Sequence, residues 1–252
     1  MSELFDLSGR RAFVTGANTG IGQAIALSLG QAGAQVICAG RSSMAETLDQ
    51  LKEAGATGFE CLTDFADKDA AVAAFGRAAE EHGPIDILVN NAGIIRRADA
   101  VDFTEADWDE VMDVNLKTVF FLCQTFARDL LARKAEGTII NIASMLSFQG
   151  GIRVASYTAS KSGIAGLTKL LACEWAAKGI NVNAIAPGYI ATNNTEALRA
   201  DRQRNDDILK RIPAGRWGEA SDIGGAAVFL SSKAARYVHG AVIPVDGGWL
   251  AR

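Results

Sequence analysis

The stretch A-F-V-T-G-A-N-T-G-I-G, residues 12–22, joins a short apolar run to a glycine-rich turn and then to a helical pattern. Gly16, Gly20 and Gly22 permit a tight turn, and the free amides at the start of the following helix can hold a pyrophosphate. The spacing G-x-x-x-G-x-G lacks the G-K-[ST] ending of an ATP-type loop. The stretch therefore predicts a strand, a dinucleotide-binding turn and a helix, the alternative being a turn with packing roles only.

Further apolar runs follow the first one along the chain. They lie at 36–40, 59–63, 85–91, 137–144, 180–187 and 241–247. Helical patterns separate them, at 21–32, 67–82, 105–134, 156–178 and 221–231. Runs that are apolar throughout are typical of strands covered on both faces, and their alternation with helices predicts a parallel sheet. We expect an α/β fold of the Rossmann type, one doubly wound parallel sheet of about seven strands with helices on both faces.

Polar and glycine-rich segments follow most of these runs, where ligands bind in such sheets. The sequence contains no linker or repeat. We therefore expect one dinucleotide-binding and catalytic domain over residues 1–252, with a substrate-loop segment at about 190–218.

The composition limits the classes of function. Hydrophobic residues make up 49% of the 252 residues, and the formal net charge of −4 does not favour nucleic acid. The four cysteines form no C-x-x-C pair, which indicates small buried hydrophobes in a reducing compartment. No signal-peptide h-region or long apolar run is present. We expect a cytoplasmic protein without a membrane partner, and the two histidines have no metal-ligand spacing.

The end of the second run bears on which dinucleotide binds. An acid there would bind the ribose diol and favour NAD. The sequence instead reads Ala39-Gly40-Arg41-Ser42, and Arg41 can pair with a 2′-phosphate. We therefore expect an NAD(P)(H) cofactor, with Arg41 favouring NADP(H). The alternative is that Arg41 is a solvated loop residue.

Tyr157 and Lys161 stand four residues apart in a helical pattern, so both would face the cleft at the end of the fifth run. A nearby ammonium favours the phenolate, so we expect Lys161 to lower the pKa of Tyr157. Tyr157 can then exchange a proton with a carbonyl or alcohol oxygen, to which Ser144 can donate a hydrogen bond. Asn115 interrupts a helical pattern; it is either a surface asparagine or a water anchor that links Lys161 to solvent.

Together these motifs resemble the classical short-chain dehydrogenase/reductase family over essentially the whole chain. The family's catalytic tetrad falls on Asn115, Ser144, Tyr157 and Lys161. The resemblance implies a homotetramer, and a lysine that also holds the nicotinamide ribose. The cofactor-binding residues it implies are Thr15, Gly16, Asn18, Thr19, Gly20, Ile21, Gly22, Arg41, Asp64, Phe65, Asn91, Ala92, Gly93, Tyr157, Lys161, Pro187, Gly188, Ile190 and Thr192.

Segments at 93–100, 143–161 and 186–201 carry a narrower resemblance, to members of the family that interconvert a 5-hydroxyl and a 5-ketone in a keto-deoxy sugar acid. Arginines near these segments support an acidic substrate, because guanidinium binds a carboxylate in a two-pronged manner. Arg97 and Arg153 are the first candidates, and subunit salt bridges are the alternative for each. The predicted substrate-binding residues are Arg97, Ser144, Gln149, Arg153, Tyr157 and Asn193.

The predicted function is an NAD(P)-dependent oxidoreductase that interconverts a secondary alcohol and a ketone on a small keto-deoxy sugar acid. Gluconate 5-dehydrogenation and reduction of a 3-oxoacyl carrier-protein thioester are the alternative reactions. A dinucleotide-binding sensor without turnover is the alternative that is not an enzyme, and it has no need of Tyr157 together with Lys161 and Ser144.

Overall fold

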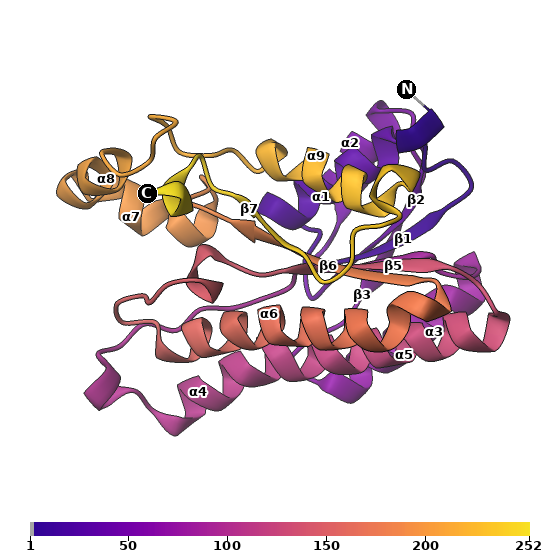
Figure 1. Ribbon diagram of the computed structural model, residues 1–252, viewed down its shortest axis with the longest axis horizontal. Coiled ribbons are helices and arrows are strands. Elements are labelled where there is room, and N and C mark those ends of the chain that lie inside the picture. Colours follow the sequence, from indigo (N-terminus) through magenta and orange to yellow (C-terminus); the bar gives the residue numbers. More distant parts are fainter. Residues whose placement is uncertain (1–2) are drawn as a thin grey trace.

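The computed structural model describes residues 3–252; residues 1–2, which fall within the predicted domain, lie outside the described residues. Within residues 3–252, seven strands form one parallel sheet in the order β3-β2-β1-β4-β5-β6-β7 (Figure 1). The strands are β1 (Arg11–Thr15), β2 (Gln35–Gly40), β3 (Gly58–Leu62), β4 (Ile87–Asn90), β5 (Gly137–Ile142), β6 (Ile180–Pro187) and β7 (Val242–Val245). The predicted Rossmann-type sheet is confirmed.

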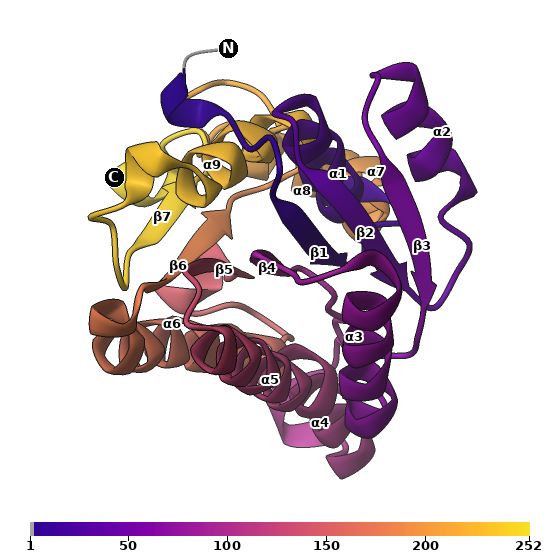
Figure 2. The same cartoon turned by 90° about the vertical axis from the view of Figure 1, so that its right-hand side faces the viewer.

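Helices cover both faces of the sheet (Figure 2). One face carries α1 (Gly20–Gln31), α2 (Ala45–Glu53) and α9 (Ser221–Ser231). The other carries α3 (Lys68–His82), α4 (Glu105–Met112), α5 (Thr118–Arg133) and α6 (Ala155–Trp175). Successive strand residues point to opposite faces, so Phe13 joins the core under α3 and α5 while Val14 joins the core under α1 and α9.

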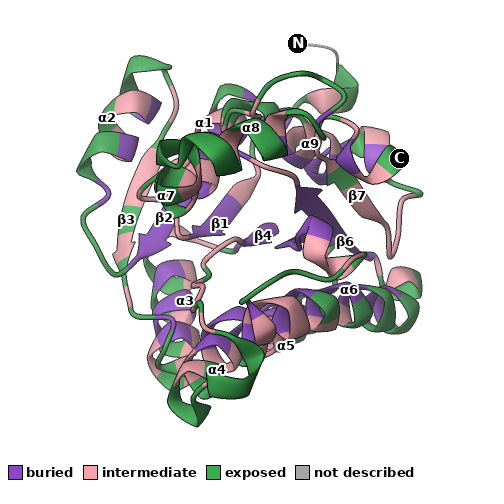
Figure 3. Cartoon of the chain, turned by 90° about the vertical axis from the view of Figure 1, so that its left-hand side faces the viewer, coloured by how far each residue is buried: buried purple, intermediate pink, exposed green. Residues whose placement is uncertain are grey.

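Two features of the helices differ from the sequence prediction. The helix expected over 105–134 is interrupted by a π-helical turn, Asp113–Lys117, which separates α4 from α5. The expected substrate loop at 190–218 contains two short helices, α7 (Glu196–Ala200) and α8 (Arg202–Leu209). Figures 1 and 3 show these two helices beyond the carboxyl ends of the strands, with much of their surface exposed.

Short 3-10 turns complete the secondary structure. They lie at Glu3–Phe5, Ala100–Asp102, Met145–Ser147, Ala176–Lys178, Asn193–Thr195, Lys233–Ala235 and Trp249–Ala251. None of the helices in residues 3–252 is long and apolar enough to cross a membrane. The cysteines follow the prediction in part, because Cys38 and Cys123 are buried while Cys173 is exposed.

The strand order places the candidate site. β1 lies between β2 and β4. The strands β2 and β3, which follow β1 in sequence, extend the sheet towards one edge, and the strands from β4 to β7 extend it towards the other. A crevice forms between loops that diverge in this way, at the carboxyl ends of the strands. The loops after β1, β4, β5 and β6 therefore meet at one end of the sheet.

Candidate active site

The glycine turn between β1 and α1 is closed too tightly for side chains. Gly16 and Gly20 have φ angles of 65° and 59°, a region that residues with a Cβ rarely adopt. A Cβ on Gly22 would lie 2.1 Å from the Gly16 carbonyl oxygen. A Cβ on Gly16 would lie 2.9 Å from the side-chain nitrogen of Asn91. The turn is therefore fixed by close backbone approach on both of its sides.

The start of α1 has the properties of an anion site. Its N-cap residue, Thr19, makes no side-chain capping hydrogen bond within the described residues. The amides of the first turn of a helix have no partner inside the helix and carry the positive end of its dipole. Together with the glycine turn, these amides match the needs of a dinucleotide pyrophosphate.

Hydrogen bonds tie the glycine turn to the loop after β4. The Thr15 hydroxyl accepts from the main-chain amides of Asn91 and Ala92, each at 2.9 Å. The Asn91 side chain donates to the carbonyl oxygens of Thr15 at 2.9 Å and Gly16 at 3.2 Å. Thr15 is buried, so it positions the cleft wall and does not line the cleft.

A cleft of about 540 Å³ opens above these loops and contains most of the predicted cofactor-binding residues. Those that line it are Gly16, Asn18, Thr19, Gly20, Ile21, Arg41, Asp64, Phe65, Asn91, Ala92, Gly93, Tyr157, Lys161, Gly188 and Thr192. The structure does not place Thr15, Gly22, Pro187 or Ile190 in the lining. Gly22 packs on the Gly16 carbonyl, Pro187 is paired with Val245 in the sheet, and Ile190 is buried beside Gly218.

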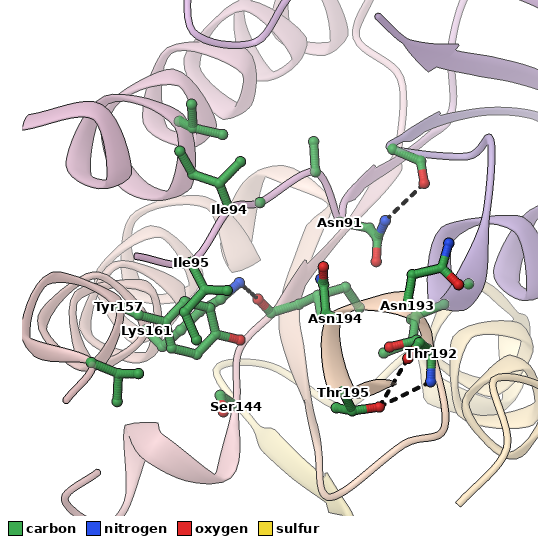
Figure 4. Close-up of a pocket in the computed structure, with 18 of the residues that line it drawn as sticks. Asn91, Ile94, Ile95, Ser144, Tyr157, Lys161, Thr192, Asn193, Asn194 and Thr195 are labelled. Atoms are coloured by element: carbon green, nitrogen blue, oxygen red, sulfur yellow. Dashed lines mark hydrogen bonds between the residues drawn. The ribbon is translucent and has the colours of Figure 1, made fainter. Parts of the chain in front are cut away.

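Tyr157, Lys161 and Ser144 come together in this cleft (Figure 4). Helix α6 carries Tyr157 and Lys161 one turn apart, and Ser144 follows β5. Figure 4 shows the three side chains facing the Thr192–Thr195 segment across the cleft. The sequence prediction that these residues share one site agrees with this arrangement.

Lys161 lies deep in the site, with 5% of its surface exposed. Its Nζ donates a hydrogen bond of 2.6 Å to the carbonyl oxygen of Ile142. Burial lowers the pKa of Lys161 to about 8. The group is therefore near the midpoint of its titration at mildly alkaline pH.

The expectation that Lys161 lowers the pKa of Tyr157 is not met. Burial raises the pKa of Tyr157, and a hydrogen bond with Ser144 and the charge of Arg97 oppose that rise. The Lys161 ammonium lies 5.6 Å from the centre of the Tyr157 ring and is bonded to Ile142. Desolvation of the phenol consequently exceeds the effect of the cation, and Tyr157 carries its proton.

Asn115 is buried, with 1% of its surface exposed, which excludes the surface alternative. Its side-chain oxygen accepts from the Ile94 amide at 2.8 Å, and its nitrogen donates to the Ile94 carbonyl at 2.9 Å and to the Ser160 hydroxyl at 3.3 Å. The π-helical turn carries Asn115, as such turns often do at functional sites. Asn115 thus fixes the loop that lines the cleft, and its role as a water anchor stays a prediction.

The arginines predicted to bind a carboxylate separate into two groups. Arg153 forms an ion pair with Asp99 at 3.1 Å and does not line the cleft, and its role in substrate binding stays a prediction. Arg97 lines the cleft, and its guanidinium donates to the Asn194 carbonyl at 3.4 Å. An acidic partner distant in sequence, as Asp99 is for Arg153, therefore distinguishes a paired arginine from an unpaired one.

Gln149 and Asn193 also differ from one another. Asn193 lines the cleft as predicted. Gln149 lies outside the lining, because its side-chain oxygen accepts from the Trp249 indole at 3.2 Å. The Gln149 side chain, which was expected to face the substrate, is therefore hydrogen-bonded to the C-terminal segment.

Sequence reasoning missed several lining residues, among them Ser42, Met145, Leu146 and Arg204. Ser42 follows Arg41, and Met145 and Leu146 follow Ser144, so adjacency alone could have indicated them. Arg204 lies on α8, four residues before the buried Ile208. This spacing is the one signal that Arg204 lies on the inward face of the helix. Among residues 3–252 no group of three His, Cys, Asp or Glu side chains is placed to hold a metal ion.

The parallel sheet, the glycine turn and the Ser-Tyr-Lys cluster define a dinucleotide-dependent oxidoreductase. A family model described as Enoyl-(Acyl carrier protein) reductase matches residues 16–250. The chain belongs to the short-chain dehydrogenase/reductase family. The predictions of an NAD(P)-dependent oxidoreductase and of an NAD(P)(H) cofactor are confirmed.

Relatives within this family are similar over their full length. The chain is 56% identical over 248 residues to the 2-dehydro-3-deoxy-D-gluconate 5-dehydrogenase of Escherichia coli strain K12, covering 98% of each chain. It is 54% identical over 252 residues to the protein of the same name from Bacillus subtilis strain 168, covering 100% of this chain and 99% of that one. A crystal structure of a protein from Agrobacterium tumefaciens described as a putative 2-deoxy-D-gluconate 3-dehydrogenase, with bound NADP, has 66% identity, a TM-score of 0.96 and complete coverage of both chains.

Proposed function

We propose that this enzyme interconverts the C5 hydroxyl and the C5 ketone of 2-dehydro-3-deoxy-D-gluconate or a close keto-deoxy sugar acid, using NAD(P)(H). The observation that carries the proposal is full-length similarity, at 49% to 56% identity, to four enzymes named 2-dehydro-3-deoxy-D-gluconate 5-dehydrogenase. In this proposal residues 1–252 act as one dinucleotide-binding and catalytic domain.

Tyr157 is the proposed proton donor in reduction and proton acceptor in oxidation. Because burial raises its pKa, the phenol keeps its proton until an oxygen that develops negative charge accepts it. The nicotinamide, when bound, supplies or accepts the hydride. In reduction one hydride and the Tyr157 proton together convert the ketone to the alcohol, so the atoms and charges balance.

Ser144 and Lys161 support this proton transfer. Ser144 is the proposed hydrogen-bond donor to the reacting oxygen, and it lies at the buried end of the cleft beside Tyr157. Lys161 is the proposed ligand of the nicotinamide ribose. A ribose hydroxyl near the Lys161 Nζ would compete with the Ile142 carbonyl for the hydrogen bonds of the ammonium. Because the pKa of Lys161 is about 8, the ammonium can deliver a proton at mildly alkaline pH.

NADP(H) is the proposed preferred cofactor. Arg41 and Ser42 line the cleft beyond β2, and no carboxylate of the described residues follows that strand directly. Arg41 is exposed and can reach a 2′-phosphate in a two-pronged manner. Asp64 and Phe65 line the same part of the cleft, where the adenine is expected.

The proposal includes a cytoplasmic homotetramer. Leu131 on α5 and Leu170 on α6 are large apolar side chains with 42% and 49% of their surface exposed. Helices α5 and α6 are the long helices on which the family resemblance places subunit contacts. Light scattering coupled to size exclusion measures the mass directly, and a monomer of 26.5 kDa at micromolar concentration would contradict the tetramer.

A kinetic panel tests the proposed reaction. The wild-type enzyme is assayed by nicotinamide absorbance with both cofactors and with 2-dehydro-3-deoxy-D-gluconate, D-gluconate, 5-keto-D-gluconate and an acetoacetyl thioester. We expect the highest kcat/KM with the keto-deoxy acid. Preference for gluconate would move the assignment to gluconate 5-dehydrogenase, and turnover of the thioester alone would favour the carrier-protein reductase.

A further inference from the structure

The charged side chains that line the cleft are unevenly distributed. Asp64 and Arg41 lie in the part expected to hold the adenosine end of the cofactor. Glu110 also lines the cleft, but its carboxylate is bound to the Arg96 guanidinium at 2.7 Å. Lys161 is bonded to the Ile142 carbonyl. The remaining charged groups of the lining are Arg97 and Arg204, both cationic.

Arg97 approaches the reacting groups from the loop after β4. Its charge is felt at the Tyr157 hydroxyl, where it opposes the rise in pKa caused by burial. Its guanidinium donates to the carbonyl of Asn194, at the beginning of the segment that leads into α7. Arg97 thus lies between the catalytic phenol and the two short helices.

Arg204 approaches the cleft from α8. Ile208, one turn later on this helix, has 3% of its surface exposed and packs in a small apolar cluster with Met145, the residue after Ser144. Side chains four residues apart lie on one helix face, so the face that holds α8 against Met145 also carries Arg204. The charge of Arg204 is felt at the Tyr189 hydroxyl, and Tyr189 lines the same cleft.

The orientation of α8 is fixed by further contacts. The Asp201 carboxylate caps the helix by accepting from the Arg204 amide at 3.0 Å. The side chain of Asn205 accepts from the Trp217 indole at 2.8 Å. Arg204 is therefore presented by a capped and anchored helix.

Three arginines near the cleft are paired with carboxylates. Arg96 is bound to Asp107 and Glu110, Arg153 to Asp99, and Arg216 to Asp222. Within residues 3–252, neither Arg97 nor Arg204 has a carboxylate within ion-pair distance. Two guanidinium groups that line one cleft and have no carboxylate partner among residues 3–252 complement a ligand carboxylate.

We propose that Arg97 and Arg204 together bind the substrate carboxylate, which bridges the loop after β4 and helix α8. Arg204 is thereby a specificity-determining residue. This inference rests on the proposed function, because it takes the substrate to be a sugar acid. It predicts that recognition of the ligand's charge, more than of its hydroxyl pattern, depends on Arg204.

The test compares Arg204→Gln with Arg202→Gln, a neighbour on α8 that does not line the cleft. Each variant is assayed with 2-dehydro-3-deoxy-D-gluconate and with its carboxamide, which keeps the shape and removes the charge. Binding of both compounds is also measured by calorimetry with NADP⁺ present, in the Tyr157→Phe background to prevent turnover. We expect Arg204→Gln to raise KM and Kd for the acid by about 10- to 100-fold, as for a lost charged hydrogen bond.

In the Arg204→Gln variant, KM and Kd for the carboxamide should stay within about twofold of the values for the parent enzyme. In the Arg202→Gln variant, KM and Kd for both compounds should stay within the same range. An unchanged acid affinity in Arg204→Gln, or an equal loss for acid and carboxamide, would overturn the inference while the proposed function stands. A wild-type enzyme that neither binds nor turns over the acid would overturn both.

Discussion

The Nζ of Lys161 donates a hydrogen bond of 2.6 Å to the main-chain carbonyl of Ile142, on the strand that leads to Ser144. One residue of α6 is thereby joined to the end of β5. The bond places the ammonium beneath the cleft, where burial lowers its pKa to about 8. This placement affects both the stability of the fold and the transfer of protons.

The pKa of Lys161 makes the stability of the cofactor-free enzyme depend on pH. Below about pH 8 the folded and unfolded states both carry the proton, and burial of the charge is fully destabilising, by about 3 kcal/mol at roughly 1.4 kcal/mol per pKa unit. Between about pH 8 and 10.5 only the unfolded state keeps the proton, so the Lys161 contribution to stability rises with pH.

Urea unfolding of wild type and Lys161→Met at pH 7 and pH 10 measures this contribution. Burial raises the pKa of Cys38 and Cys123 to about 12, which affects stability at alkaline pH in both proteins, so only the difference between them is used. We expect the methionine variant to be the more stable at pH 7 and to lose most of that advantage at pH 10. A difference that is constant with pH would show that Lys161 keeps its ordinary pKa.

Tyr157→Phe removes the proposed proton donor and leaves the ring. We expect kcat to fall by about 1000-fold, in the range of a lost general acid, while the Kd of NADP(H) measured by fluorescence stays within about threefold. Tyr237→Phe is the matched control, because Tyr237 is 99% exposed. Near-normal kcat in the Tyr157 variant would assign the proton to another group.

Arg41→Asp replaces the proposed 2′-phosphate ligand by an acid that can bind a ribose diol. The ratio of kcat/KM for NADP to that for NAD should fall by about 100-fold, since a charged contact is lost and a repulsive one is added. Arg41→Lys, which keeps the charge without the planar fork, should fall between the two. Equal ratios in all three proteins would exclude Arg41 from the cofactor site.

Ser147 holds two parts of the site together. Its hydroxyl donates to the Lys161 carbonyl at 2.6 Å and accepts from the Ser144 amide at 3.4 Å. We expect Ser147→Ala to lower kcat about 10-fold with little change in KM, and Ser147→Thr to restore it. Lys169→Ala, at an exposed position of α6 two turns beyond Lys161, should behave as wild type; an equal loss there would indicate a general effect on the helix.

Local sequence predicted the strands well because they are short apolar runs buried on both faces. The sheet core around Phe13 and Val14 needed only this pattern and the alternation with helices. The same logic could not foresee the π-helical turn at Asn115, whose side chain is hydrogen-bonded to Ile94, a residue distant in sequence. Helix α8 is rich in charged residues, so only its packing on Met145 reveals its inward face.

The spacing predicted that the candidate catalytic residues share one site, but it did not predict their pKa values. Four-residue spacing places Tyr157 and Lys161 on one helix face, but it does not reveal that the ammonium is bonded to Ile142 and that desolvation determines the pKa of the phenol. Likewise, the spacing does not reveal that Arg153 forms an ion pair with Asp99, which is distant in sequence. Charge pairing between residues far apart in sequence is the information that the linear pattern lacks.

A crystal structure of the Tyr157→Phe enzyme with NADP⁺ and 2-dehydro-3-deoxy-D-gluconate tests the central claim most directly. The account predicts the C5 hydroxyl beside Ser144 and the edge of the substituted aromatic ring, with the carboxylate between Arg97 and Arg204. A sugar acid bound with C5 remote from Ser144, or with its carboxylate turned to solvent, would contradict it.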